Sequence, residues 1–433
     1  MISLAALHRR QVPIDRSNDR LVALGAIGIA ITFLVGSLLA TLLPTQVRLG
    51  MWLPLHLALA GAATTAIAGI MPFFSAAFAA APPSDVRLRW AAVVAVALGA
   101  ASVAGGVVAA QVSLSVPGGV VFVIGIALTG IATIRPMGGA LGPSRGLVTQ
   151  GYVVALCEVA VGATLATLYL AGWSPVVGDW TAAKPAHAWL NLVGFVSLVI
   201  ATTLLHFFPT VVGARISVRP SARITVVGLA AGAPLVAVGS LLQSDVIARV
   251  GAVSVLAGAA ALAVNARRTW QTRSHWTTDP GWHRFAMGGL VSAIVWFDVG
   301  MLIAAGRVLT FGAAPASWSI DTIAGPFIAG WIGLAVVASA THLVPAIGPG
   351  DPSAHARQRQ ILGRVANLRL TVWNIGTASL SLGLLAHMPT AAGVGITLIA
   401  VGLGATAVLL GSAVVVGLHG RKPATWPKPG PPC

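Results

Sequence analysis

The chain has 433 residues, of which 57% are hydrophobic and 8% are charged, and its mean hydropathy is +0.89. A soluble core cannot bury this share of apolar residues, so the composition excludes a soluble globular protein and indicates an integral membrane protein. The net charge of +16 does not indicate a nucleic-acid partner, because the basic residues cluster in loops between apolar runs.

The apolar residues form long continuous runs, and about 20 helical residues span the hydrocarbon of a bilayer. Continuous rather than alternating runs favour helices over a barrel. The sequence therefore predicts an all-α, polytopic membrane helical bundle, with one membrane domain over 21–419 between a cytoplasmic segment 1–20 and a Pro-rich cytoplasmic tail 420–433. The predicted spans are about twelve: 21–43, 52–78, 90–113, 116–134, 147–171, 187–212, 222–242, 246–265, 284–306, 323–345, 368–388 and 392–417.

The distribution of Lys and Arg predicts the orientation of the chain. With the N-terminus in the cytoplasm, all of the 26 basic residues except Arg48, Lys184, Arg249 and Arg307 fall on the inner side. This asymmetry follows the positive-inside rule and predicts a multi-pass protein of the plasma (inner) membrane with both termini cytoplasmic. The lipid bilayer is its first predicted partner, and the oligomeric state stays open.

Two predicted spans share a pattern that repeats along the chain. Residues 194–209 align with 330–345 without a gap, and the alignment pairs Gly194 with Gly330, Leu198 with Leu334, His206 with His342 and Pro209 with Pro345. Pro72 in the second span precedes Pro209 by 137 residues, and Pro209 precedes Pro345 by 136. The spacing predicts three repeats of four helices each.

This topology resembles subunit I of the haem–copper oxidases, which has twelve helices in three four-helix arcs and histidines on helices two, six and ten. Residues 56–69, HLALAGAATTAIAG, are similar to a motif of the NnrS family of haem- and copper-containing membrane proteins. Residues 187–216 resemble the membrane region that precedes a multicopper-oxidase domain in some actinobacterial proteins. The resemblance implies haem b, copper, or both as cofactors.

The sequence departs from the oxidase pattern in several places. Span 222–242 contains no histidine, and the two tyrosines, Tyr152 and Tyr169, lie far from every histidine in the sequence. A complete oxygen-reducing centre is therefore not expected, even if the fold is shared.

The membrane histidines fall into two groups by predicted depth. The outer group is His56, His187 and His387, and the inner group is His206, His283 and His342. His187 and His206 lie 19 residues apart on one span, about 28 Å along a helix, so they belong to different sites. We expect all six to bind cofactor, with His56, His187, His206 and His342 as metal ligands, and with haem slots beside Gly61, Gly69, Gly194 and Gly330. The alternative is a set of interfacial histidines that reach towards lipid headgroups.

Two carboxyl groups within predicted spans are the candidates for proton transfer. Asp298 could orient an outer histidine or pair with Arg307. Glu158, the only glutamate in the chain, lies at the centre of span five and could carry protons. Its alternative role is a hydrogen bond across helices to Asn191, Thr202 or Asn374.

These features predict a redox protein that binds haem b or copper and takes part in electron transfer, or in redox chemistry of nitric oxide or copper, with a redox partner on the outer face. Whether it is an enzyme stays open. The second prediction is a proton-coupled secondary transporter that uses Glu158 and Asp298, although such carriers usually repeat in halves of five or six helices. The third is a membrane subunit without cofactor.

Overall fold

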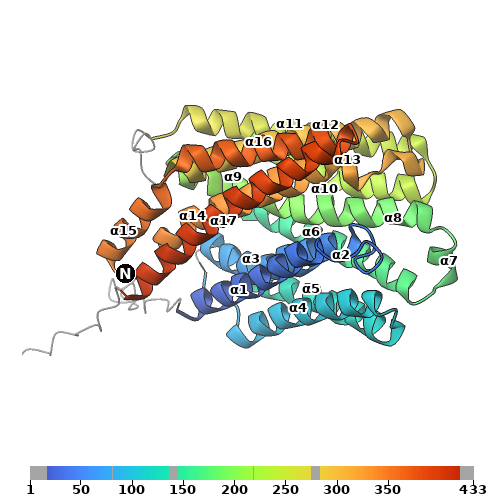
Figure 1. The fold of residues 1–433 in the computed structure, drawn as a ribbon, viewed down its shortest axis with the longest axis horizontal. Helices are drawn as coiled ribbons and strands as arrows, with labels where there is room; N and C mark the ends of the chain where they lie inside the picture. The colour runs from blue at the N-terminus through green and yellow to red at the C-terminus, as the bar shows by residue number, and fades with distance from the viewer. Residues whose placement is uncertain (1–16, 80, 137–144, 218, 275–282, 420–433) are drawn as a thin grey trace, which may run out of the picture. The chain divides into compact units, whose positions relative to one another are not determined.

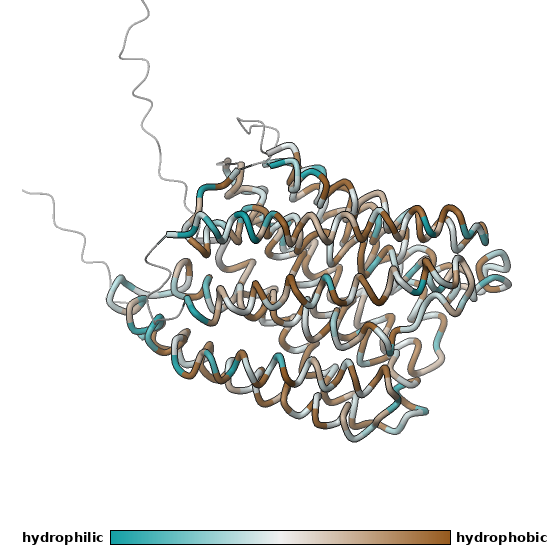
Figure 2. Tube along the Cα trace, turned by 90° about the horizontal axis from the view of Figure 1, so that it is seen from above, coloured by the Kyte–Doolittle hydropathy of each residue, from teal (hydrophilic) through white to brown (hydrophobic). Residues whose placement is uncertain are grey.

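The computed structural model describes residues 17–79, 81–136, 145–217, 219–274 and 283–419, and these residues fold almost entirely into helices (Figure 1). The prediction of an all-α polytopic bundle is confirmed. The tail 420–433 and most of segment 1–20 lie outside the described residues. Figure 2 shows apolar residues along the middle of the helices and hydrophilic residues gathered at their ends.

Eleven helices in the described part of the chain are long and apolar enough to cross a membrane. They are Leu21–Ala40, Trp52–Ala79, Val86–Val108, Val112–Ile134, Gly146–Leu170, Trp180–Val212, Pro220–Leu241, Asp245–Gln271, His283–Phe311, Pro315–Ile347 and Pro389–His419. The remaining predicted span, 368–388, is the 20-residue helix α16 (Ala366–Leu385), which is less apolar because it carries Asn367, Arg369 and Asn374.

The chain divides into two compact units, Met1–Val199 with Val236–Gln243 and Ile200–Leu235 with Ser244–Cys433. Both histidine pairs described below lie within single units. The expected single domain over 21–419 stays a prediction.

The described helices follow one order three times. In each repeat the first helix packs against the span that follows it. The three first helices are α1 (Ser17–Ala40), α6 (Arg145–Leu170) and α12 (His283–Phe311). That second span starts with a short α-helix, continues as a π-helix and ends as an α-helix that contains a proline. Its three versions are α2 (Trp52–His56), η2 (Leu57–Ala63) and α3 (Thr64–Ala79); α8 (Trp180–Trp189), η4 (Leu190–Ser197) and α9 (Leu198–Val212); and α13 (Ile320–Ile323), η7 (Ala324–Gly333) and α14 (Leu334–Ile347).

The position of the π-helices supports the repeat. In the second and third versions the α-helix resumes at Leu198 and Leu334, which the sequence alignment pairs, and Pro209 and Pro345 follow eleven residues later. A π-helix inserts an extra residue in a turn, so it rotates all the side chains beyond it about the helix axis.

In each repeat the two long helices that follow the second span form a hairpin (Figure 1). These hairpins are α4 (Val86–Val108) with α5 (Val112–Ile134), α10 (Pro220–Leu241) with α11 (Asp245–Gln271), and α16 with α17 (Pro389–His419). Glycines let the backbones touch: a Cβ on Gly106 would lie 2.5 Å from Ser115 N, one on Gly228 2.8 Å from Gly258 Cα, and one on Gly376 3.0 Å from Gly395 O. In lipid, where burial of apolar surface gives little net gain, this close approach is what holds helices together.

Each hairpin turn has three residues, and the middle one is left-handed: Ala110 (φ 53°), Gln243 (φ 49°) and His387 (φ 54°). In the first and third turns the next N–H bonds the carbonyl five residues back, from Gln111 to Gly106 and from Met388 to Gly383, at 2.7 Å each. This is the bond that closes a Schellman motif and allows an abrupt reversal. His387 therefore occupies the position that Ala110 and Gln243 occupy in the other turns.

We expect Gly106→Ala to destabilise the protein, because the added methyl forces α4 and α5 apart; overpacking of this kind costs about 1–3 kcal/mol. Gly105→Ala is the matched control, since its Cβ would meet only Leu114 Cδ2 at 4.0 Å. Thermal unfolding of both variants in detergent measures the difference. Equal melting temperatures for the two variants would contradict the proposed close approach.

Candidate functional site

The structure brings together two of the three outer histidines. His56 ends α2 directly before η2, and His187 lies in α8, three residues before η4. Their ring centres are 6.3 Å apart and the ring planes differ by 12°. Both side chains are half-buried, and both belong to the first compact unit.

Backbone carbonyls fix the tautomer of both rings. His56 Nδ1 lies 2.7 Å from the carbonyl oxygen of Trp52, and His187 Nδ1 lies 2.8 Å from that of Gly162. A carbonyl only accepts, so each Nδ1 carries a proton, and in the neutral form of the ring Nε2 keeps its lone pair. Histidines that bind metals usually show this arrangement, with the second nitrogen bonded to a carbonyl or carboxylate.

Asn191, in the same membrane span as His187, hydrogen-bonds to it. Its amide nitrogen donates to the His187 carbonyl oxygen at 2.5 Å and lies 3.2 Å from His187 Nδ1. Because Nδ1 already donates to Gly162, the bond to the carbonyl is the effective one. Sequence reasoning missed the contact of Gly162 with His187, because the two residues lie on different helices. The spacing of four residues between His187 and Asn191 is the signal that could have indicated the support from Asn191.

Aromatic rings flank the outer pair. Trp52 stacks on His56 with ring centres 4.1 Å apart, and Trp180 lies 6.4 Å from His187. Tyr169, which is far from the histidines in sequence, stacks on Trp180 at 4.0 Å. Helical spacing could have found Trp52 and Trp180, because they lie four and seven residues before His56 and His187 on the same helices. Tyr169 could not have been found in this way, because its contact with Trp180 joins α6 to α8.

The separation of the rings fits one metal atom between them. A metal about 2 Å from two imidazole nitrogens, each about 1 Å from its ring centre, places the ring centres of opposed ligands about 6 Å apart. Both the iron of haem b and a two-coordinate copper ion meet this requirement. The outer pair thus has the spacing and the tautomers that a metal between two histidines needs.

The inner histidines give a second pair. His283, at the start of α12, and His342, in α14, have ring centres 6.1 Å apart with planes at 51°. The edge of Phe207 packs against His342 at 5.6 Å. His206, the neighbour of Phe207 in α9, is buried like the other two. This pair lies within the second unit and repeats the spacing of the outer pair.

His387 is not part of a histidine pair in the structure. It is exposed in the turn between α16 and α17. Among the described residues, no group of three or more His, Cys, Asp or Glu side chains lies close enough to hold a metal ion. The candidate centres therefore each rest on two histidines.

Glu158 makes none of the hydrogen bonds expected of it. Its side chain is 5% exposed, and neither carboxyl oxygen has a hydrogen-bond partner among the described residues. The predicted partner Asn191 bonds His187, and Asn374 accepts from Trp296 at 2.9 Å. The carboxyl group fills a notch in η4 instead, where a Cβ on Gly194 would come within 2.6 Å of Glu158 Cδ.

Asp298 lies in α12 and does not pair with Arg307, so this prediction is wrong. The Arg307 guanidinium donates to the carbonyl of Ala316 and lies 5.4 Å from the Phe311 ring centre. Asp298 Oδ1 is buried and has no hydrogen-bond partner among the residues that the structure describes. The role of Asp298 beside an outer histidine stays a prediction.

The glycines expected to leave slots for haem are filled by neighbouring side chains, so that expectation is wrong. A Cβ on Gly61 would lie 2.7 Å from Phe33 Cγ, and one on Gly330 2.5 Å from Trp296 Cβ. Gly194 meets Glu158, and Gly69 meets the Cβ of Ala26. These glycines serve helix packing, because small residues are what allow helices to approach closely in a membrane.

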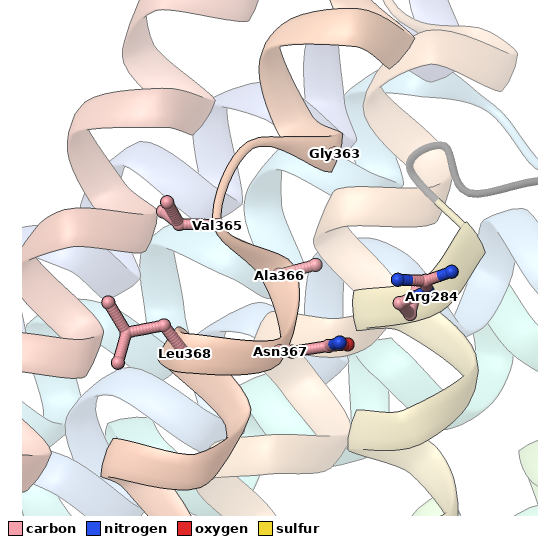
Figure 3. A pocket seen from close by; sticks show the side chains of 6 residues that line it. All are labelled: Arg284, Gly363, Val365, Ala366, Asn367 and Leu368. Atoms are coloured by element: carbon pink, nitrogen blue, oxygen red, sulfur yellow. The ribbon is translucent and has the colours of Figure 1, made fainter.

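A separate recess of about 210 Å³ lies at the start of α16 (Figure 3). Arg284 of α12 faces it, together with the first turn of α16 and the preceding Gly363 and Val365. Figure 3 shows the Arg284 side chain close to Asn367. Arg284 follows His283, so this polar recess adjoins the end of α12 that carries one member of the inner pair.

The sequence matches no protein-family model, and it has no similar sequence among curated proteins. The resemblance to haem–copper oxidases and to the NnrS family therefore stays a prediction. The geometry of the two histidine pairs is the basis for a functional proposal.

We expect Gly194→Ala to destabilise the protein by about 1–3 kcal/mol, because the new methyl overlaps the Glu158 carboxyl group. In the Gly194→Ala background, Glu158→Ala should lower the free energy of unfolding by much less than it does in the wild-type protein. The reason is that removal of the carboxyl group leaves room for the new methyl. Thermal unfolding of the two single variants and the double variant measures this coupling. Strict additivity would show that the two residues do not touch.

Proposed function

We propose that this protein is an integral membrane redox protein of haem–copper oxidase-like architecture. Each histidine pair holds one metal atom, either the iron of haem b or a copper ion. The observation that carries the proposal is the outer pair: two imidazoles on separate helices, with Nδ1 bonded to backbone carbonyls and ring centres 6.3 Å apart.

The residues around the outer pair have defined roles in this proposal. His56 and His187 present Nε2 to the metal, and the carbonyls of Trp52 and Gly162 hold the rings in place. Trp52 and Trp180 limit the access of water to the ligands. A metal bound in this way supplies one-electron chemistry, and its potential depends on the low polarity of these surroundings.

We further propose that the protein takes part in electron transfer, or in redox chemistry of nitric oxide or copper, with a partner protein on the outer face. His187 and His206 occur near opposite ends of one continuous span, Trp180–Val212. The sequence lacks the histidine and tyrosine pattern of a full oxygen-reducing centre, so oxygen reduction is not part of the proposal.

We expect the purified protein, produced with haem and copper supplied, to contain bound metal. His56→Ala or His187→Ala should remove the metal of the outer pair, because one imidazole alone holds a metal weakly. For the same reason His283→Ala or His342→Ala should remove the metal of the inner pair. The measurements are metal analysis and optical spectra before and after reduction by dithionite: haem b shows a sharp reduced α-band, and copper does not.

His387→Ala is the matched control, since His387 is exposed in a turn. Unchanged metal content in all four pair variants would contradict the proposal, as would a metal-free wild-type protein.

A proton-coupled secondary transporter is the second proposed function. It is favoured by the burial of both Glu158 oxygens and of Asp298 Oδ1, which have no hydrogen-bond partner within the described part of the chain. In that case Glu158→Gln abolishes proton-dependent uptake by proteoliposomes, while His56→Ala leaves it intact. If the His56→Ala variant loses its bound metal but keeps proton-dependent uptake, the result would support the transporter function over the redox function.

A further inference from the structure

The notch that Glu158 fills occurs in all three repeats. In each, the first helix inserts a side chain against a glycine of the following π-helix: Phe33 against Gly61, Glu158 against Gly194 and Trp296 against Gly330. Two of the three inserted side chains are aromatic. A hydrophobic side chain therefore suffices for packing at this place in the fold, and a carboxyl group within the hydrocarbon costs free energy. Packing alone therefore does not explain why a glutamate occupies position 158.

Glu158 has no charged neighbour among the described residues that would explain it. The elements that pack against α6 include α3, α5, α7 (Ser174–Val177), α8 and η4, and Leu165 of α6 also packs on a cluster that contains Ala237 of α10. Of these, α3, α5, α7 and η4 contain no Asp, Glu, Lys, Arg or His, α8 contains only Lys184 and His187, and α10 contains only Arg223, fourteen residues before Ala237. On α6 itself the titratable side chains near Glu158 are Tyr152 and Cys157. Within the described residues, its carboxyl oxygens accept no hydrogen bond.

Glu158 is connected to the outer pair through the same helix interface. Gly162, whose carbonyl fixes His187, follows Glu158 by one turn of α6, about 6 Å along the axis. Asn191, which bonds the His187 carbonyl, lies between His187 and Gly194 in sequence and contacts Gly162, where a Cβ would come within 3.0 Å of Asn191 Cγ. A buried carboxyl thus lies one turn away from the support of a proposed metal ligand, without touching the ligand itself.

We propose that Glu158 is a proton-binding group whose protonation is coupled to the redox state of the metal held by His56 and His187. When a one-electron donor protein adds an electron to this centre, the Glu158 carboxylate binds one proton from the aqueous phase, and oxidation releases that proton. One negative charge and one positive charge are gained together, so the net charge of the low-dielectric site is unchanged. This inference rests on the proposed redox function.

The test is the pH dependence of the midpoint potential of the outer centre, measured in the His342→Ala background so that the outer metal is observed alone. Uptake of one proton per electron changes the reduction equilibrium tenfold per pH unit, which is about 59 mV for a one-electron couple. We expect this slope in the parent protein, a flat profile in Glu158→Gln, and a displaced but sloping profile in Glu158→Asp, which keeps a carboxyl group.

The infrared difference spectrum between the oxidised and reduced protein gives a readout of the carboxyl group itself. The C=O stretch of a protonated carboxylic acid should gain intensity on reduction, and the signal should be absent in Glu158→Gln. Cys157→Ser is the matched control, since this neighbouring side chain on α6 is exposed, and it should keep both the slope and the infrared signal.

The outcomes separate the two proposals. Normal metal content with a pH-independent potential, or an infrared signal that persists in Glu158→Gln, would overturn the coupling and leave the redox function standing. A protein that binds neither haem nor copper would overturn both. A slope that is lost equally in Cys157→Ser would show that the effect is not specific to the carboxyl group.

Discussion

Close approach of helix backbones through glycine is the constraint on which this structure depends. In a bilayer the lipid chains are as apolar as the side chains, so helices associate mainly through van der Waals contact and a few hydrogen bonds. The hairpins α4–α5, α10–α11 and α16–α17 meet this requirement in the same way, with Gly106, Gly228 and Gly376 against the neighbouring backbone. Tight packing of this kind leaves little room for polar groups, so those that are present need a specific explanation.

The π-helices are the second device repeated by the fold, and they connect packing with the site. Each lies in the second span of its set and offers a glycine notch to the preceding helix. His56 and His187 lie just before η2 and η4, whereas His206 and His342 lie in the α-helices that follow η4 and η7. The extra residue in the π-turn rotates one end of the span relative to the other. A single span can therefore direct functional side chains differently at its two ends.

The polar groups of the membrane region are used sparingly. Nδ1 of each outer histidine bonds a backbone carbonyl, that of Trp52 one turn earlier for His56 and that of Gly162 on the adjacent helix for His187, so no additional charge is buried to orient the rings. Asn374 likewise joins Trp296 and the carbonyl of Leu370 within the second unit. Glu158 and Asp298 differ from the other carboxyl groups of the described residues, because buried oxygens of both lack hydrogen-bond partners there. Their cost is what makes them functional candidates.

The sequence by itself determined the membrane class, the helical spans, and the repeat marked by Pro209 and Pro345, because hydropathy and spacing along one helix are local properties. It also identified the histidines that form the two pairs. Only the tertiary structure decided which histidines meet, since helix order does not determine helix adjacency: His56 lies beside His187, while His387 lies exposed in a turn. The contacts of Asn191 with His187 and of Glu158 with Gly194 likewise depend on the rotation of each helix about its axis. A π-helix changes that rotation, and the hydrophobic pattern does not reveal it.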